Sequence, residues 1–283
     1  MNKKAYLELT KPRLVLLALL ASISSFYMAS KGALDTALLF HALLGSALVG
    51  GGANALNQFI ERDLDAKMAR TQNRPIPSGR VPDKKALLFG ALFSLGGLLY
   101  LFLFVNKFTS FVGFLVPATY VFLYTPLKRK TPLNTFVGAL SGALPVLLGW
   151  TAVNPSLNLE AMILFSILFA WQIPHFLAIA WVYKEDYLKG GFKMFGADDS
   201  SGQTLGWHIV AASLVLFALS LAPTFMGITG LTYLFMAVFF GVNLCGFAIY
   251  LATHRLSYAK QFIYASIIYL FTLNISMVVD KAG

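Results

Sequence analysis

Long apolar stretches recur along this chain, and they constrain its fold more than any other feature. Hydrophobic residues make up 58% of the 283 residues and charged residues only 12%, too apolar a composition for a soluble domain of this length. About 17–25 consecutive apolar residues are enough to cross a bilayer as a helix. Nine stretches qualify, near residues 14–30, 36–60, 86–105, 109–126, 133–152, 159–183, 205–224, 229–251 and 258–279.

Within these stretches the apolar residues run continuously and do not alternate with polar ones. An alternating pattern is what the strands of a membrane barrel require, so a barrel is excluded. The sequence therefore predicts an all-α polytopic membrane protein. We expect nine transmembrane helices that form a single domain over residues 1–283.

The basic residues are distributed unequally between the two sides of the predicted bundle. With nine spans, 19 of the 22 lysines and arginines share the side of the N-terminus, and only Lys31, Lys107 and Lys281 lie on the other. Cytoplasmic segments carry such an excess, so we expect the N-terminus and residues 57–85 in the cytoplasm. The net charge of +10 thus reflects topology and does not indicate nucleic acid, which would need a basic patch on a polar domain.

The start of the chain bears on the membrane in which the protein resides. The first apolar stretch begins too soon for a cleaved signal peptide, and no small-residue cleavage site follows it. An Arg- and Ser-rich transit peptide is also missing. We therefore expect a bacterial plasma membrane and no organelle.

A dense charged stretch follows the second apolar run. If that run continues as helix, Asn57, Glu61 and Asp65 recur at i, i+4 and i+8 on one face, over about 12 Å. Oxygen ligands on one stripe, with arginines close behind, suit a hard cation that bridges to phosphate oxygens. The alternative is an amphipathic helix end whose charges are merely solvated at the lipid headgroups.

Basic side chains around this stretch are candidate ligands for an anion. Residues 61–85 form the longest polar segment, and its bases outnumber the nearby acids. The planar fork of arginine suits a diphosphate better than the point charge of lysine. The candidates are Arg62, Arg70 and Arg74, with Lys128 and Arg129 in the next loop on the same side. Binding of anionic lipid, or a role only in topology, is the alternative.

A second acidic cluster follows the sixth apolar stretch. Glu185 and Asp186 lie on the same side as the first cluster, so the two carboxylate groups are expected to converge over one cavity and hold two Mg²⁺ ions around a diphosphate. His175 is expected on the same helix, about two turns earlier and behind a proline kink at Pro174. Its neutral imidazole suits a role as iron ligand or base. A hydrogen-bonded histidine of the bundle is the alternative.

The two clusters resemble those of the UbiA-type prenyltransferases, whose signature is Asn-x-x-x-Asp-x-x-x-Asp with a second acidic motif. Within that family the chain is most similar to the branch that farnesylates protohaem IX, from about residue 8 to its end. Glu61 departs from the general signature as this branch commonly does. In the second motif, His175-Phe176 stand where a carboxylate is usual. The matching pieces are residues 61–68, Arg70-Thr71, Arg74-Pro75, Tyr124-Thr125, residues 127–129, Thr131, Asn134, Gly138, Gly142-Ala143, Pro145, Gly149-Trp150, residues 171–176 and Asp186-Tyr187.

This resemblance implies farnesyl diphosphate and haem B as substrates, haem O as product and Mg²⁺ as cofactor. The implied metal ligands are Asn57, Glu61 and Asp65, with Glu185 and Asp186 as the second set. The implied diphosphate ligands are Arg62, Arg70, Arg74, Lys128 and Arg129. Asn57, Glu61, Asp65, His175 and Asp186 would take part in catalysis, with His175 on the haem side. The lipid bilayer is an implied partner, and haem A synthase or an oxidase-assembly protein is another.

Two other functions stay open on the sequence. A UbiA-type transferase that acts on an aromatic acid or quinone precursor needs the same diphosphate site and differs only in its acceptor. A secondary transporter has broken helices and a polar site at mid-depth. The acids of this chain lie instead at one membrane face, which argues against transport.

Overall fold

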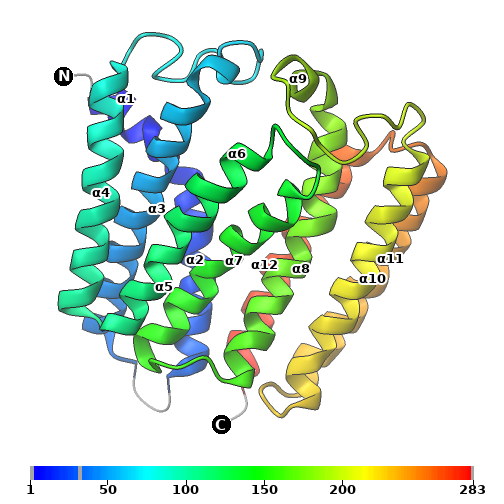
Figure 1. The fold of residues 1–283 in the computed structure, drawn as a ribbon. Helices are drawn as coiled ribbons and strands as arrows, with labels where there is room; N and C mark the ends of the chain where they lie inside the picture. The colour runs from blue at the N-terminus through cyan, green and yellow to red at the C-terminus, as the bar shows by residue number, and fades with distance from the viewer. Residues whose placement is uncertain (1–2, 31–33, 282–283) are drawn as a thin grey trace. The chain divides into compact units, whose positions relative to one another are not determined.

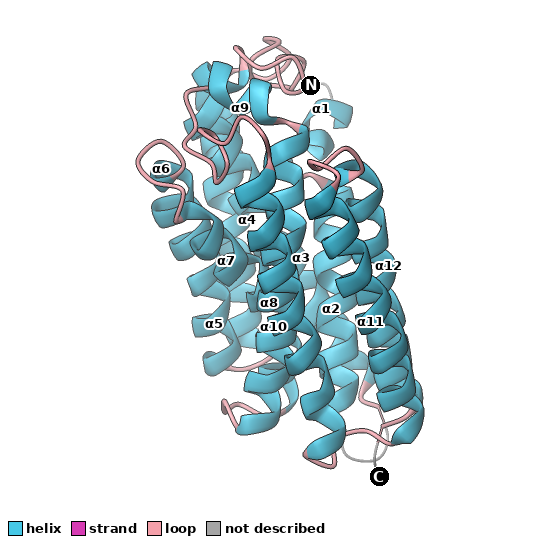
Figure 2. Ribbon diagram, turned by 90° about the vertical axis from the view of Figure 1, so that its right-hand side faces the viewer, coloured by secondary structure: helices cyan, strands magenta, loops and turns pink. Residues whose placement is uncertain are grey.

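The computed structural model describes residues 3–30 and 34–281, which are almost entirely helical (Figures 1 and 2). Over these ranges there is no β-strand, and Thr229 and Lys281 form only an isolated bridge. The elements are α1 (Lys3–Leu9), α2 (Pro12–Ala29), α3 (Thr36–Asp65), α4 (Asp83–Phe104), α5 (Lys107–Pro117), η1 (Ala118–Tyr124), α6 (Thr125–Leu127), α7 (Asn134–Val153), α8 (Leu159–Val182), α9 (Lys184–Lys189), α10 (Gln203–Phe225), α11 (Leu231–Thr253) and α12 (Ala259–Val279).

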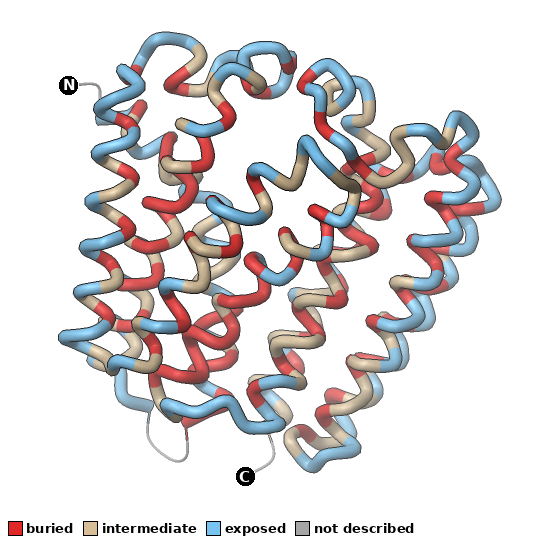
Figure 3. Tube along the Cα trace, viewed as in Figure 1, coloured by how far each residue is buried: buried red, intermediate tan, exposed pale blue. Residues whose placement is uncertain are grey.

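The prediction of nine membrane-crossing helices is confirmed for the described part of the chain. Eight of them are single α-helices, and the fourth is the continuous run Lys107–Leu127. Helix α4 shows how they meet lipid, because Leu88, Leu92, Leu95 and Leu99 are all exposed and recur on one face of the helix. Figure 3 shows that the helices of the bundle carry exposed segments along their length. So large an apolar surface is stable only against hydrocarbon. The protein is therefore a multi-pass membrane protein.

The second span is longer than expected and reaches the charged stretch. We expected it to end near residue 60, but α3 continues for 30 residues to Asp65. No glycine or proline lies between Ala53 and Asp65, so nothing in the sequence interrupts the helix there. The motif is therefore held on regular helix and not on a loop.

Helix α1 was not predicted, since the first expected helix begins near residue 14. Its apolar residues Ala5 and Leu9 are fully buried in a cluster with Ala55, Ile76 and Val81. Gln58 Nε2 donates to the carbonyl of Leu9 at 2.8 Å. Contact with α3 and with the loop after it thus stabilises a helix that is too short to form alone.

Contacts between residues divide the chain into two compact units. The first unit comprises Met1–Ser156 and Glu185–Lys193, and the second comprises Leu157–Lys184 and Met194–Gly283. In the first unit, α1, the loop after α3 and α9 lie at the same end (Figure 1). In the second, each helix packs against two neighbours in the cyclic order α8, α10, α11, α12.

Small residues and serines join the helices of the first unit. Ser22 Oγ and Ser25 Oγ of α2 donate to the carbonyls of Pro145 and Val146 in α7, at 2.6 and 2.7 Å. Gly149 lies so close to α2 that a Cβ there would overlap the carbonyl oxygen of Ser22. In a membrane, such close backbone contacts and interhelical hydrogen bonds replace the hydrophobic effect as the force between helices.

The fourth span changes its helical pitch before it reaches the site. Residues Ala118–Tyr124 form a π-helix between α5 and α6. Thr125 Oγ1 donates to the carbonyl of Tyr120 at 2.8 Å, and Ser141 Oγ donates to Thr119 Oγ1 at 2.8 Å. The second of these bonds joins the π-helix to α7. π-Helical turns are frequent at functional sites, and this one carries Tyr120 and Tyr124.

The second unit is closed at its ends by carboxylates. Asp199 accepts hydrogen bonds from the backbone amides of Ser201, Gly202 and Leu205 and so caps the start of α10. The Leu205 amide is the main cause of the lowered pKa of Asp199. At the other end, Asp280 accepts from the amide of Tyr233 at 2.7 Å.

The contact between α2 and α7 leads to a stability prediction. We expect Gly149→Ala to lower the free energy of unfolding by about 1–3 kcal/mol, because overpacking forces the helices apart. Gly96→Ala is the matched control, since a Cβ at Gly96 meets nothing within 4 Å. Thermal unfolding in detergent measures both variants. Equal melting temperatures for the two would contradict the close contact at Gly149.

Candidate active site

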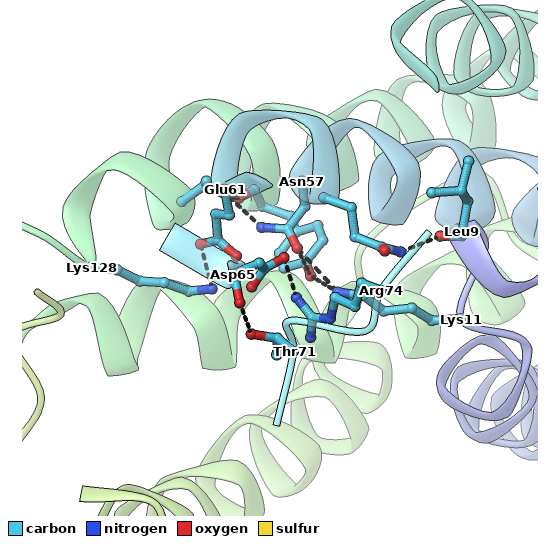
Figure 4. A network of polar contacts seen from close by, with 11 residues as sticks. Leu9, Lys11, Asn57, Glu61, Asp65, Thr71, Arg74 and Lys128 are labelled. Atoms are coloured by element: carbon cyan, nitrogen blue, oxygen red, sulfur yellow. Dashed lines mark hydrogen bonds and ion pairs between the residues drawn. The ribbon is translucent and has the colours of Figure 1, made fainter. Parts of the chain in front are cut away.

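The three predicted oxygen ligands of α3 lie on one face of the helix and share one polar network (Figure 4). Asn57, Glu61 and Asp65 are 1%, 4% and 0% exposed. A buried carboxylate is stable only when it is paired or coordinated, so neither acid is a solvated charge. The alternative of a solvated amphipathic helix end is therefore wrong.

Each of these side chains is held by a basic residue from a different segment. Lys11 Nζ donates to Asn57 Oδ1 at 3.0 Å. Lys128 Nζ is 2.8 Å from Glu61 Oε1, and Arg74 Nη1 is 2.6 Å from Asp65 Oδ2. Charge-assisted pairs in so little water are strong, and they attach three segments to α3.

Sequence reasoning missed Lys11, which it treated only as a determinant of topology. Lys11 precedes α2 with φ 50°, in the left-handed region, and its ammonium group turns back to Asn57 and to the hydroxyl of Tyr120 at 3.3 Å. Burial, and then the nearby guanidinium of Arg74, lower the pKa of Lys11 to about 7. The available signal was a lysine just ahead of Pro12, at the headgroup level where α2 begins.

Lys128 lies between aromatic rings. Its ammonium nitrogen is 4.4 Å from the ring centroid of Tyr124 and 5.5 Å from that of Phe192. Burial opposes the charged form, but the carboxylate of Glu61 and the phenol groups of Tyr124 and Tyr120 raise the pKa of Lys128 above its ordinary value. Lys128 is therefore a fixed positive charge at this site.

Backbone contacts hold the loop after α6 and the segment after α9 together. The amide of Lys193 donates to the carbonyl of Lys128 at 2.7 Å. Asn134 Nδ2 donates to the carbonyl of Lys193 at 2.8 Å. These two bonds connect parts of the first unit that are about 60 residues apart in the sequence.

The loop after α3 folds back onto the motif. Thr71 Oγ1 donates to the backbone carbonyl of Asp65 at 2.8 Å, which places Arg74 beside the Asp65 carboxylate. Arg80 closes the loop against α1, since its guanidinium makes two bonds to Glu8, at 2.6 and 2.9 Å. A polar segment thus acquires a defined conformation from buried bonds to neighbouring helices.

One oxygen of the motif is left unpaired. Asp65 Oδ1 is buried and has no hydrogen-bond partner among the described residues. A buried carboxylate oxygen without a partner needs an explanation, and an ion is one of the usual ones. Within the same residues, no group of three His, Cys, Asp or Glu could hold a metal. Two carboxylates and an amide oxygen instead fit Mg²⁺, which prefers one or two carboxylates with waters and substrate phosphates.

The other predicted anion ligands have different surroundings. Arg62 lies outside this network, 2.8 Å from Asp83 and above the ring of Phe59. Arg70 lies 5.0 Å from the ring centroid of Tyr187. Tyr187 belongs to the segment that carries the second acidic cluster. Arg129 is exposed. The structure therefore brings Arg74 and Lys128 to the motif, and Arg70 to the second cluster.

The second acidic cluster does not share a helix with His175, and our expectation that it would is wrong. Helix α8 ends at Val182, because Tyr183 leaves helical geometry, and Glu185 and Asp186 belong to the separate helix α9. The segment Glu185–Lys193 belongs to the first unit, where Gly190 lies beside Met68 of the loop after α3. Glu185 is exposed and Asp186 half-buried.

His175 lies in the second unit, on a helix that continues through Pro174. Its Nδ1 is 2.8 Å from Ser266 Oγ, and the ring of Trp171 stacks on it at 4.6 Å between centroids. Ser266 Oγ donates its own proton to the carbonyl of Ile263 at 2.8 Å. It therefore accepts from His175 Nδ1–H, which leaves the lone pair of Nε2 available.

Comparison with known proteins identifies the family. The UbiA prenyltransferase family model matches residues 15–274. A protoheme IX farnesyltransferase of Solibacter usitatus is 38% identical over 98% of this chain and 99% of its own length. Protoheme IX farnesyltransferase 1 of Pseudomonas putida strain W619 is also 38% identical, over 97% of this chain and 93% of its own.

Solved structures share the fold at low sequence identity. A digeranylgeranylglyceryl phosphate synthase has a TM-score of 0.83 at 18% identity, and 99% of each chain is covered. A UbiA homolog from Archaeoglobus fulgidus bound to GPP and Mg2+ has a TM-score of 0.70 at 14% identity, over 97% of this chain and 99% of its own. The fold, the extent of the family match and the full-length relatives agree. The chain belongs to the UbiA prenyltransferase family.

Proposed function

We propose that this protein transfers the farnesyl group of farnesyl diphosphate to a vinyl group of haem B with release of diphosphate, and that water then adds to the resulting cation and loses a proton, giving haem O. The curated relatives that match over nearly the whole chain at 38% identity carry the name protoheme IX farnesyltransferase. The observation in the structure that carries the proposal is the buried network of α3, with an unpaired carboxylate oxygen and three basic side chains. It offers ligands for a cation and for an anion side by side. The two units would work as one domain over residues 1–283.

The cation of this proposal is Mg²⁺, held by Asn57, Glu61 and Asp65. Glu185 and Asp186 are the proposed second set of ligands, and the contact between Arg70 and Tyr187 supports this, since it would bring them toward a diphosphate bound by Arg70. When bound, the metal would supply a Lewis acid that withdraws charge from the leaving diphosphate. The unpaired Asp65 Oδ1 supports this assignment, because coordination would remove the cost of a buried oxygen without a partner.

The protein's own side chains would bind and orient the diphosphate. Arg74 and Lys128 lie at the motif, and their charge-assisted hydrogen bonds would strengthen as negative charge develops on the leaving group. Arg70 would add a planar fork from the side of α9. Arg62 and Arg129 stay predictions as diphosphate ligands. Apolar surroundings would keep water away from the allylic cation until the acceptor attacks it.

His175 would act on the haem side of the reaction. Its Nδ1–H is fixed by Ser266, and Trp171 fixes the plane of its ring. A histidine held in this way presents a neutral Nε2, the form that ligates iron or accepts a proton. We propose that Nε2 binds the haem iron or orients the acceptor. Catalysis would need no redox change, since haem is the substrate.

The bilayer is the medium of the proposed reaction, in a bacterial plasma membrane with the α3 network facing the cytoplasm. The excess of basic residues on that side supports this orientation. A partnership with haem A synthase or an oxidase-assembly protein stays a prediction. Neither an aromatic or quinone acceptor nor a transport function is favoured by a specific observation. The test is direct: the purified protein, given farnesyl diphosphate, Mg²⁺ and haem B, should yield haem O by mass spectrometry, and unchanged haem would contradict the proposal.

The role of Asp65 is tested by Asp65→Asn. We expect turnover to fall by about 10²–10³-fold, the range seen when one charge-stabilising group is removed from an active site. Arg74 would lose its charged partner, so stability would also fall, and activity must be expressed per folded molecule. The control is Asp63→Asn, because the Asp63 side chain is 80% exposed. Full activity of the Asp65 variant at saturating Mg²⁺ would contradict the assignment.

The role of Arg70 is tested by Arg70→Lys, which keeps the charge and removes the planar fork. The apparent KM for farnesyl diphosphate should rise about tenfold, equivalent to ~1.5 kcal/mol for one charge-assisted hydrogen bond, while the KM for haem stays constant. Arg80→Lys is the control, since Arg80 pairs with Glu8 on α1. An equal change in both KM values, or no change, would contradict this role. It would favour the alternative that Arg70 binds anionic lipid or only determines topology.

The role of His175 is tested by His175→Ala, with exposed His208→Ala of the same unit as control. We expect haem binding about tenfold weaker, or a shifted Soret band, with the affinity for farnesyl diphosphate unchanged. A histidine that only stabilises the bundle would instead lower stability by about 1–2 kcal/mol through its lost hydrogen bond. In that case the haem spectrum and the turnover per folded molecule would equal those of the wild type.

A further inference from the structure

Each of the three α3 side chains proposed as metal ligands has one oxygen in contact with a basic side chain in this structure, and Asp65 Oδ1 alone of that helix's carboxylate oxygens, all within the described residues, is buried and unpaired. Lys11, Lys128 and Arg74 each hold one of the three side chains, at 3.0, 2.8 and 2.6 Å. The three come from separate segments: the residue before α2, the residue after α6 and the loop after α3. The same contacts therefore hold these three segments together and engage oxygens that a metal ion would need.

These contacts oppose a metal ion that arrives alone. The network already has three basic side chains against the two carboxylates of Glu61 and Asp65. A dication near Asn57 Oδ1 would meet the side-chain nitrogen of Lys11 at close range, and the protonated form of that group would repel it strongly because water is scarce. A diphosphate brings several negative charges and many acceptor oxygens. With it bound, the net charge around the α3 oxygens becomes negative and attracts a metal ion.

We infer that Lys11 is a further diphosphate-binding residue, and that Lys11, Lys128 and Arg74 move from the α3 oxygens to diphosphate oxygens when the anion binds. The released oxygens, Asn57 Oδ1, Glu61 Oε1 and Asp65 Oδ2, then join the unpaired Asp65 Oδ1 as ligands for the metal, so that metal binding depends on the anion. This inference rests on the proposed function in one respect, the identity of the anion as a diphosphate.

The surroundings of Lys11 fit such an exchange. Asn57 Nδ2 donates to Thr125 Oγ1 at 3.1 Å, so the amide is fixed with Oδ1 directed at Lys11. If Lys11 departs, Asn57 Oδ1 keeps its bond from the Tyr120 hydroxyl at 3.2 Å and gains a free lone pair. The flexible four-carbon stem of lysine allows the ammonium to change partners while the backbone stays in place.

The backbone of Lys11 is fixed at the junction between α1 and α2. Its φ of 50° lies in the left-handed region, which costs an L-residue free energy and persists where the surrounding contacts require it. Here the junction of two helices requires it: the Lys11 amide donates to the carbonyl of Glu8, and its carbonyl accepts from the amides of Leu14 and Val15. The backbone is thus held in place while the side chain reaches Asn57 and Tyr120.

The test measures metal binding without turnover. Mn²⁺ binding to the full-length protein in detergent is followed by electron paramagnetic resonance, with and without inorganic diphosphate. For the wild type, diphosphate should tighten Mn²⁺ binding at least about tenfold. In Lys11→Met, Mn²⁺ alone should bind about tenfold more tightly, whereas diphosphate should bind about tenfold more weakly. Lys67→Met, on an exposed residue of the next loop, should match the wild type.

The opposite signs of the two changes distinguish exchange from a structural role. A lysine that only supports the site would weaken both ligands on removal, and unchanged or weaker binding of Mn²⁺ alone would overturn the inference. Should Lys11→Met fail to fold, Lys11→Arg keeps the charge and should preserve the dependence on diphosphate; loss of that dependence would also overturn it. Because the assay contains no haem, failure of haem farnesylation leaves its result intact, and normal farnesylation does not rescue a negative result.

Discussion

The ion pairs of α3 are the interaction on which the site depends. Glu61 and Asp65 are buried at the end of a membrane-spanning helix, where an unpaired carboxylate would be unstable. Their partner Arg74 comes from the loop after α3 and Lys128 from the loop after α6, and Lys11 adds a third basic side chain beside Asn57. Each loop carries a basic residue that pairs with a buried carboxylate, and this ion pair holds the loop in place. The pairs explain how polar segments are ordered at the end of an apolar bundle.

The membrane spans place these charges. Hydrocarbon provides no hydrophobic force between helices, so close glycine contacts and serine bonds, such as those of Gly149, Ser22 and Ser25, define how α2 and α7 pack. The π-helix of the fourth span then sets the position of Tyr120 and Tyr124 against Lys11 and Lys128. A regular α-helix would place these phenol groups differently around the axis.

The proposed chemistry depends on the charges of this network. Its carboxylates are already paired with basic residues, so it should bind a free dication weakly and bind a metal together with a polyanion more tightly. The proposed role of His175 belongs to the second unit, where Ser266 and Trp171 leave only Nε2 for a ligand. The side chains proposed to bind the farnesyl donor and the haem acceptor therefore belong to different units and have different hydrogen-bond partners. Their roles can be tested separately.

The sequence by itself determined the helical class, the nine spans and the face shared by Asn57, Glu61 and Asp65. Hydrophobic length and helical spacing are local properties, and they survive any tertiary arrangement. It did not show α1, the π-helix or the partners of the basic residues. Lys11 and Arg62 look alike as cytoplasmic bases, yet Lys11 reaches Asn57 whereas Arg62 pairs with Asp83. Nor did it show that α8 ends before Glu185. Only the tertiary structure decided these points, because which charge meets which depends on contacts between residues far apart in the chain.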